Sequence, residues 1–535
     1  MKRIVALILT LVLVITSAVA LGEQVGPTIA EHVTRGTKME RLTEEPVTLT
    51  MWIDMTSHDV TDVVGDFQNM DILKAIEEKT GVRIELIVPP VGEAATNFSL
   101  MLTNRKYPDI IIGFDNMYSS GGDEAIEEGI ILDLKDLVEQ YMPNYQAART
   151  ASEYRMLNTI TDEGTMPYIC TLSYQDQSSI TYGGPIIRQD VLDKLGLDMP
   201  VTFDDWHEYL TRAKDELGMT RGLGLANTGI SKYNAFNAAF DFGMSDPAQG
   251  GVFYVKDGVV QYGPLSEGYK DYVTLMAQWY SEGLIDPDFT STITFDDGVA
   301  MMSGNLCSAT SEHSGVLDYV NSLGVAIDPD FKFVAAPTPV LNEGDQLHYG
   351  YIHGGAPIIK SAAISTSCED PVLAARLLDQ LFTDEGFLLC NYGTEGKTYE
   401  IVDGVPVFTD LVTHNDKGTP THMMTAYAAP ISWPFVSVYG REDTDALAAY
   451  SEIWDSNNDY SYSFPSGVTL NAEEKEIYAD YYGDIESYVQ EMTVKFIMGL
   501  ESIDQYDNFV QVLKDQGIEE VMSAYQTAYD RYMSR

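Results

Sequence analysis

"VTLTMWIDM", residues 47–55, begins the stretch of sequence that decides the fold. Its apolar and polar residues alternate, as they do in a half-buried β-strand. Helical spacing follows and stops at Gly81, a residue suited to a helix C-terminus. Two more strands are predicted at residues 82–90 ("VRIELIVPP") and 108–114 ("PDIIIGF"), with a helix at 97–104 between them. Strands that alternate with helices in this way predict an α/β domain with a largely parallel sheet.

A second α/β unit is predicted further along the chain. The segments 184–196 and 202–218 are helix-rich, and Thr202 and Asp205 are spaced as a capping box at the start of the second helix. A strongly periodic helix follows at 269–283, and the C-terminal third ends in further helices. The sequence shows no internal repeat and no low-complexity linker. It therefore predicts two α/β lobes, joined by several crossings of the chain, with a helix-rich C-terminus.

The N-terminal residues have the pattern of an export signal. Basic residues precede an apolar run at 4–15, and residues 18–20 form a small-x-small site. This pattern predicts a signal peptide over residues 1–20, followed by a flexible polar leader at 21–45. A retained anchor is the alternative, but the run is shorter than the about 20 residues that a membrane span needs. We expect an exported protein, periplasmic or extracellular at the cell surface.

The charge balance excludes one large class of partners. Against 81 acidic residues stand 32 basic ones, a net charge of −49. A field of this sign repels nucleic acid and anionic lipid and favours solubility. Nucleic-acid binding is thereby excluded. Hydrophobic residues make up 45% of the chain, enough for large cores, and the length suggests two or three domains.

The cysteines suggest neither a lipid anchor nor a metal site. They are Cys170, Cys307, Cys368 and Cys390, so no lipobox cysteine follows the signal segment. In an oxidising compartment they are either buried thiols or partners in one or two disulfides, with three pairings open. No CxxC or Cys/His spacing suggests zinc, and we expect no metal and no cofactor.

Several phrases, taken in order, resemble the large extracellular solute-binding proteins of carbohydrate ABC importers. The similarity is greatest to the long subgroup that includes alginate- and oligosaccharide-binding proteins and lipoprotein-type members. The phrases span nearly the whole chain after the signal segment. They are "EEKTGVRIEL" (77–86), "MLTNRKYPDIII" (101–112), "EEGIILDLKDLVEQYMPN" (127–144), "IIRQDVLDKLGLDMPVTFDDWHEYL" (186–210), "WYSEGLIDPDF" (279–289), "YGTEGKTY" (392–399) and the segment 488–532.

The resemblance implies a two-lobed α/β fold of the periplasmic-binding-protein type II, with a hinge and an interlobe cleft. An oligosaccharide or sugar would bind in the cleft of a monomer, and the closed form would dock on ABC permease subunits. The expected first lobe comprises residues 46–178 plus 338–392, and the second comprises 179–337 plus 393–535. Some long relatives carry a calcium loop, but the corresponding segment at 214–229 lacks alternating oxygen ligands, so we expect none here.

Sugars present apolar C–H faces beside hydroxyls, so a sugar site combines aromatic rings with paired polar groups. In open α/β sheets ligands bind beyond the carboxyl ends of strands, and the resemblance places the start of the second lobe near the cleft. Arg188 has a structural alternative, since it could pair with Asp190 or Asp193. The candidate ligand-binding residues are Trp52, Asp54, Asp115, Asn116, Tyr118, Tyr182, Arg188, His353, Tyr392, Glu395 and Trp433.

Two other functions stay open at this point. A secreted glycan-degrading enzyme needs only two carboxyl groups about 5 to 10 Å apart, which carry no short sequence signature. The sequence has no nucleophile elbow, no HExxH and no phosphate-binding glycine motif, and its element order does not suggest an eightfold barrel. A binding protein for a peptide or another solute would share the fold. Among sugars, the acidic chain favours a neutral glycan over a polyuronate.

Overall fold

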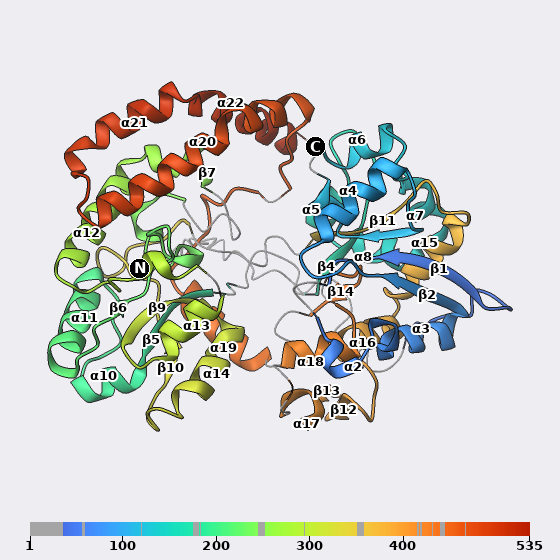
Figure 1. The fold of residues 1–535 in the computed structure, drawn as a ribbon, viewed down its shortest axis with the longest axis horizontal. Helices are drawn as coiled ribbons and strands as arrows, with labels where there is room; N and C mark the ends of the chain where they lie inside the picture. The colour runs from blue at the N-terminus through green and yellow to red at the C-terminus, as the bar shows by residue number, and fades with distance from the viewer. Residues whose placement is uncertain are drawn as a thin grey trace, which may run out of the picture.

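The computed structural model describes residues 36–534, with the exception of 56–58, 119, 175–180, 182, 244–251, 294, 350–357, 415–416, 418–419, 431, 439–443 and 466. Two lobes lie side by side (Figure 1). The first holds the blue N-terminal elements. The second holds the green and yellow elements and the red C-terminal helices. This arrangement confirms the two-lobed α/β fold that the sequence predicts.

A six-stranded mixed sheet forms the centre of the first lobe, in the order β14-β4-β11-β3-β1-β2. Its strands are β1 (Val47–Trp52), β2 (Val82–Ile87), β3 (Ile110–Ile112), β4 (Ile169–Ser173), β11 (Ile358–Ile364) and β14 (Val436–Ser437). β1 runs parallel to β2 and β3, whereas β11 runs antiparallel to both β3 and β4. The expectation of a largely parallel sheet is wrong for β11, because this strand returns from the other lobe and not through a helical crossover.

Helices of the first lobe pack around this sheet and around one another. They are α2 (Thr61–Val64), α3 (Asp71–Thr80), α4 (Ala94–Asn104), α5 (Phe114–Met117), α6 (Gly122–Glu127), α7 (Lys135–Tyr141), α8 (Pro143–Arg149), α9 (Glu153–Asn158), α15 (Pro371–Gln380), α16 (Asp384–Tyr392), α17 (Asp410–Thr413) and α18 (Pro420–Tyr427). α3 buries Ile72, Leu73 and Ile76 and ends at Gly81, whose φ of 79° is left-handed. Glycine adopts this conformation without steric cost, so the predicted end of the helix is confirmed.

The second lobe is built on a four-stranded sheet in the order β10-β5-β9-β6. Its strands are β5 (Gly183–Arg188), β6 (Gly222–Leu223), β9 (Cys307–His313) and β10 (Phe333–Ala335), and a separate hairpin joins β7 (Phe253–Lys256) to β8 (Val259–Tyr262). Its helices before the C-terminal group are α10 (Gln189–Leu195), α11 (Phe203–Leu217), α12 (Glu267–Ser281), α13 (Phe295–Ser303), α14 (Ser314–Gly324) and α19 (Thr444–Asp455). The capping box of α11 is confirmed, since Thr202 and Asp205 exchange hydrogen bonds of 2.8 and 3.2 Å.

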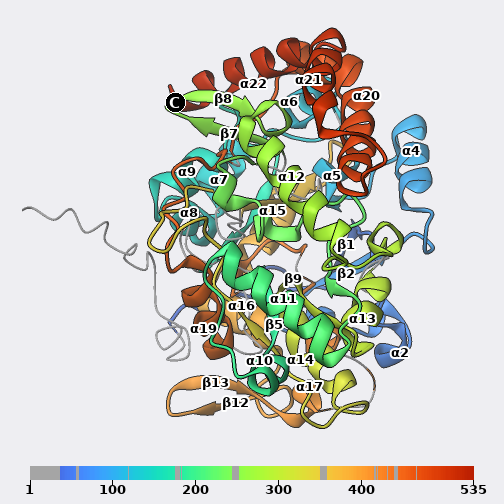
Figure 2. The same ribbon diagram turned by 90° about the vertical axis from the view of Figure 1, so that its left-hand side faces the viewer.

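Three helices complete the second lobe at the C-terminus, and Figure 2 shows them in red along its upper edge. They are α20 (Ala472–Ile497), α21 (Tyr506–Asp515) and α22 (Ile518–Met533). α20 buries Ile485, Val489, Met492 and Phe496 in the same hydrophobic core as α12. The predicted helix-rich C-terminus is therefore part of the second core.

The second and third passages of the chain between the lobes differ from the expected ones. Residues from 338 onward were expected in the first lobe, but Val340 and Leu347 pack with Ala238 in the second. Residues 393–435 were expected in the second lobe, but Trp433 and Phe435 fill the core of the first, and β14 extends the sheet beside β4. The hairpin of β12 (Tyr399–Val402) and β13 (Val405–Phe408) packs against α16 through Tyr392. The chain thus changes lobes between β4 and β5, between β10 and β11, and between β14 and α19. The boundary between the lobes in this part of the chain is set by Trp433 and Phe435, because burying their large apolar side chains in the first core is favourable.

The four cysteines are buried and none is bonded to another. Of the two alternatives that the sequence left open, buried thiols are therefore confirmed. Burial raises the pKa of Cys170, Cys307 and Cys368 to about 12, so these thiols stay protonated and unreactive near neutral pH. In the described part of the chain, no helix is both long enough and apolar enough to cross a membrane.

A carboxyl group lies beside the first passage between the lobes. Asp455, at the end of α19, accepts hydrogen bonds from the hydroxyls of Thr181 and Tyr460. Burial raises the pKa of Asp455 to about 6, although the hydrogen bonds from Thr181 act to lower it. A carboxyl group whose pKa is raised by folding contributes stability at low pH and loses it as the pH rises through the folded-state pKa.

Asp455→Asn is therefore expected to stabilise the protein at about pH 8 by about 1–2 kcal/mol, because the amide keeps the hydroxyl contacts without burying a charge. This figure is discounted for the partial exposure of the site. At about pH 4, where the wild-type carboxyl is protonated, the two proteins should unfold alike. Urea unfolding at both pH values measures the difference in the free energy of unfolding between the two proteins. An equal difference at both pH values would contradict a raised pKa for Asp455.

Candidate functional site

Two tryptophans predicted to face a ligand lie instead in the core of the first lobe. Trp52 is 1% exposed, packs on Phe98 with ring centroids 5.8 Å apart, and donates its indole N–H to Asn97 Oδ1 at 2.9 Å. Trp433 is also 1% exposed, and its carbonyl oxygen accepts from the Thr171 hydroxyl at 2.6 Å. Neither ring offers a face to a ligand, because neighbouring side chains cover both.

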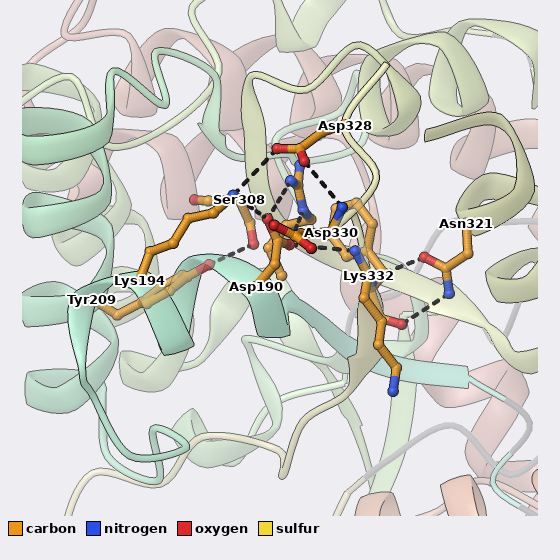
Figure 3. A network of polar contacts seen from close by, with 10 residues as sticks. Asp190, Lys194, Tyr209, Ser308, Asn321, Asp328, Asp330 and Lys332 are labelled. Carbon is orange, nitrogen blue, oxygen red and sulfur yellow. Dashed lines mark hydrogen bonds and ion pairs between the residues drawn. The ribbon is translucent and has the colours of Figure 1, made fainter. Parts of the chain in front are cut away.

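Arg188 has a structural partner, the alternative that the sequence left open. Its guanidinium donates to both carboxylate oxygens of Asp190, at 2.7 and 2.8 Å, and lies 3.9 Å above the ring of Phe331. Figure 3 shows the network around Asp190, which also accepts from Lys194 at 3.0 Å and from the backbone N–H of Lys332 at 3.3 Å. Arg188 ends β5, whereas Gly183, beside the passage between the lobes, begins it. The network therefore lies away from that passage.

Tyr118 and Tyr392 are buried as well. Tyr118 donates its hydroxyl to Glu128 at 2.8 Å, and burial together with this carboxylate raises the pKa of Tyr118 to about 12. Tyr392 packs between Tyr399 and Phe408, with ring centroids 5.8 and 5.3 Å away. Glu395, the candidate three positions after Tyr392, is exposed in the turn before β12. These positions hold the first lobe together or face solvent.

Three predicted residues keep positions suited to a ligand, at the carboxyl ends of β1 and β3. Asp54 follows β1 and is half-buried, while Asn116 is exposed on α5 after β3. Asp115 pairs with Lys360 of β11 at 3.5 Å. They remain predictions. Two further candidates, Tyr182 and His353, lie outside the described residues.

The pocket that sequence reasoning missed lies in the second lobe, at the end of β9. It encloses about 230 Å³. Its polar wall is centred on Glu312, which is 3% exposed and accepts from Lys232 Nζ at 2.9 Å and from the Tyr233 hydroxyl at 3.2 Å. His313 completes this wall, and its pKa is lowered by burial and by the charge of Lys232, against the opposing effect of Glu312. The lining also includes the apolar side chains of Leu225, Ile293, Met301 and Met302.

A strained turn presents the polar wall. Tyr233 and Asn234 have φ values of 59° and 55°, a conformation uncommon for residues with a side chain. Asn237 holds the turn by donating to Asn234 Oδ1 at 2.8 Å, and the Ser231 hydroxyl accepts from the backbone of residue 236 at 2.9 Å. The ring of Tyr233 lies so close to Gly183 that a Cβ there would be 2.7 Å from it. Only glycine allows this approach.

The position of the pocket relates it to the other lobe. Gly183 pairs with His313 in the sheet, and the strand that precedes Gly183 in the chain, β4, belongs to the first lobe. The pocket therefore lies at the end of the second sheet at which the chain enters it from the first lobe. A lining that combines apolar and hydrogen-bonding side chains suits a ligand that has both C–H faces and hydroxyl groups.

The two lobes also contact each other through the C-terminal helices. Lys475, on the first turn of α20, donates to the carbonyl oxygen of Ser120 at 2.8 Å, and Arg531 on α22 donates to Asp162 at 2.6 Å. Burial and the neighbouring charge of Lys360 lower the pKa of Lys475. These contacts join the lobes at a second place besides the chain passages.

Within the described part of the chain, no group of three or more His, Cys, Asp or Glu side chains is placed to hold a metal ion. The polar wall of the pocket holds one carboxylate, Glu312, whose two oxygens already accept hydrogen bonds. Its geometry therefore suits hydrogen bonding to a ligand better than metal coordination.

Comparison with known proteins extends over both lobes. Residues 68–386 match the family model for bacterial extracellular solute-binding proteins. The chain is similar to Lipoprotein LipO of Bacillus subtilis (strain 168), with 24% identity across 85% of this chain and 88% of that protein. It is also similar to the fructooligosaccharide ABC transporter substrate-binding protein FusA of Streptococcus pneumoniae serotype 4, with 22% identity across 86% and 87% of the two chains.

Solved structures share the fold. The alginate-binding protein AlgQ2, in a crystal structure without calcium ion, aligns with a TM-score of 0.70 at 22% identity and covers 92% of this chain and 100% of its own. FusA in complex with kestose aligns with a TM-score of 0.71 at 18% identity and covers 91% and 99% of the two chains. At these identities the alignments establish the fold and leave the ligand undecided.

Proposed function

The chain belongs to the family of bacterial extracellular solute-binding proteins, and from this premise we propose that it captures an oligosaccharide or sugar between its lobes and delivers it to an ABC permease. The observation that carries the proposal is the pocket beside Gly183, whose lining combines polar and apolar side chains. Relatives named for fructooligosaccharide and alginate binding support a sugar as the ligand class. Peptides and other solutes are the competing ligands.

The proposed mechanism is ligand-gated closure. Groups at the ends of β1 and β3 in the first lobe, such as Asp54 and Asp115, would meet a ligand seated in the pocket of the second. A ligand shifts the balance between open and closed forms only through its higher affinity for the closed form. We place the lobe boundaries between β4 and β5, between β10 and β11, and between β14 and α19.

Export and partners belong to the same proposal. The protein would act outside the cytoplasm, in the periplasm or at the cell surface, as a monomer that docks on permease subunits. The ligand would leave unchanged, since the matched family and relatives are binding proteins. A secreted glycan-degrading enzyme is the alternative, and chemical recovery of the ligand separates the two.

Thermal unfolding against neutral and acidic oligosaccharides tests the function. One glycan should raise the melting temperature, by an amount equivalent to about 2.7 kcal/mol at a hundredfold excess over Kd. It should be recovered intact, whereas degraded glycan would favour the enzyme. No shift with any glycan, together with a shift with peptides, would overturn the sugar proposal.

A variant of the pocket ties this binding to the site. Gly298 on α13 lines the pocket, and a Cβ added there would meet no atom within 4 Å. Gly298→Trp should therefore fold, because glycine is less favourable inside a helix than a residue with a side chain. The bulky indole ring should fill the pocket and abolish the rise in melting temperature that the glycan causes. The matched control is Gly483→Trp on α20, where the Cβ also meets no atom within 4 Å. Equal shifts in both variants would place the ligand elsewhere.

A further inference from the structure

The polar wall of the pocket is electrically balanced. Glu312 is 3% exposed, and a carboxylate buried to this extent requires a partner of opposite charge. Lys232 supplies that charge at 2.9 Å, so the ammonium group, which would otherwise attract an anionic ligand, already has its counter-charge inside the protein. The one positive and one negative side chain of this wall sum to zero.

His313, the other titratable side chain of the polar wall that could carry a positive charge, is neutral near neutral pH. Burial lowers the pKa of His313, and the charge of Lys232 lowers it further, while Glu312 acts in the other direction. A neutral imidazole donates and accepts single hydrogen bonds, as hydroxyl groups do. The Tyr233 hydroxyl likewise offers a neutral hydrogen-bonding group beside Glu312.

Two lysines also lie beside carboxylates at the edge of the first sheet where β3 ends, Lys360 on β11 and Lys475 on α20 of the second lobe. Lys360 pairs with Asp115 at 3.5 Å. Lys475 donates to the Ser120 carbonyl oxygen, and the nearby carboxylates of Asp115 and Asp123 act on it as counter-charges. An acidic sugar would therefore meet compensated cations on this edge too, within a chain whose net charge of −49 repels anions at long range.

We propose that Glu312 makes the pocket selective for uncharged glycans over uronate-containing ones, by neutralising Lys232. This inference rests on the proposed function, since it concerns the ligand of the same pocket. The relatives do not decide the point, because they include proteins named for alginate and for fructooligosaccharides. A ligand hydroxyl can share the hydrogen bonds of Glu312, whereas a ligand carboxylate would be repelled by it.

Calorimetry with probes of defined charge tests the proposal on the wild-type protein. The probes are neutral tetrasaccharides of fructose, glucose and galactose, tetragalacturonate, and methyl-esterified tetragalacturonate. The tightest neutral probe should bind at least about 100-fold more tightly than tetragalacturonate, and esterification should recover about tenfold or more. Tetragalacturonate as the tightest ligand would overturn the selectivity. Failure of every probe would instead refute glycan binding, and with it the proposed function.

The variant Glu312→Gln tests the residue itself. The amide keeps the size of the side chain and its oxygen acceptor but leaves Lys232 without its counter-charge. Affinity for tetragalacturonate should rise by about tenfold or more and fall again with added salt, as an exposed ionic contact does. Glu491→Gln is the matched control, because it removes one charge from an exposed pair with Lys495 on α20. An equal gain in both variants, or none in Glu312→Gln, would overturn the role of Glu312.

Discussion

Arg188→Met is expected to lower the free energy of unfolding by about 3 kcal/mol, because it leaves the Asp190 carboxylate buried without its main partner. Asp190 is 5% exposed, and the guanidinium satisfies both of its oxygens. The variant also loses the contact between the guanidinium and the ring of Phe331. Lys194 still reaches Asp190 at 3.0 Å, which keeps the loss at the lower end of the range for broken buried pairs.

Urea unfolding measures this loss, and glycan binding provides the contrast. Affinity should stay at the wild-type level, since Arg188 lies at the far end of β5 from Gly183. The double variant Arg188→Met with Asp190→Asn should lose less stability, because no uncompensated charge stays buried. Wild-type stability combined with lost binding would show that Arg188 contacts the ligand.

The pair also has a predictable pH dependence. Burial acts to raise the pKa of Asp190, but hydrogen bonds and the charges of Arg188 and Lys194 outweigh it and hold the pKa below its usual range. A carboxylate with a depressed pKa contributes stability above its unfolded-state pKa and loses it as the pH falls through the folded-state value. The gap between wild type and Arg188→Met should therefore narrow in acid.

Trp433→Ala is expected to cost about 3–5 kcal/mol, as large-to-small changes of buried tryptophan do. The side chain is 1% exposed among the core residues of the first lobe, next to Phe435 and β14. Its removal opens a cavity where the last part of the first lobe joins the sheet. Destabilisation without a separate binding defect would support the packing role.

Urea unfolding followed by circular dichroism measures this loss of stability. Tryptophan fluorescence is less suitable, because the substitution removes one of the fluorophores. Trp433→Phe is the graded control and should lose less stability than Trp433→Ala. The indole N–H of Trp433 makes no hydrogen bond to the described residues, so phenylalanine removes volume but no hydrogen bond. If the Trp433→Ala protein were as stable as the wild type but no longer bound glycan, Trp433 would be a ligand-binding residue and not a core residue.

Both predictions concern residue types that sugar sites use and that structural cores use as well. Arginine forms paired hydrogen bonds with a carboxylate of the protein as readily as with a ligand, and tryptophan packs on a core as readily as on a sugar ring. Local sequence around Arg188 and Trp433 fits either role. Only the neighbours in space, Phe331 for the first and the core of the first lobe for the second, decide between them.

Local elements were readable from the sequence because their causes are local. The strand at 47–55, the helix that stops at Gly81 and the capping box of Thr202 with Asp205 depend on residues a few positions apart. Their alternation was enough to predict two α/β lobes. The antiparallel return of β11 was not predictable in this way, since its partners lie more than 180 positions away in the chain.

The sequence by itself therefore determined the fold class, the order of the main elements and the acidic character of the chain. The tertiary structure alone decided which polar residues share a pocket. Lys232 and Glu312 are separated by 80 positions and meet only because β9 pairs with β5 beside the strained turn at Tyr233. Patterns along the chain reveal the period of an element, whereas burial and charge pairing depend on contacts between elements that packing brings together.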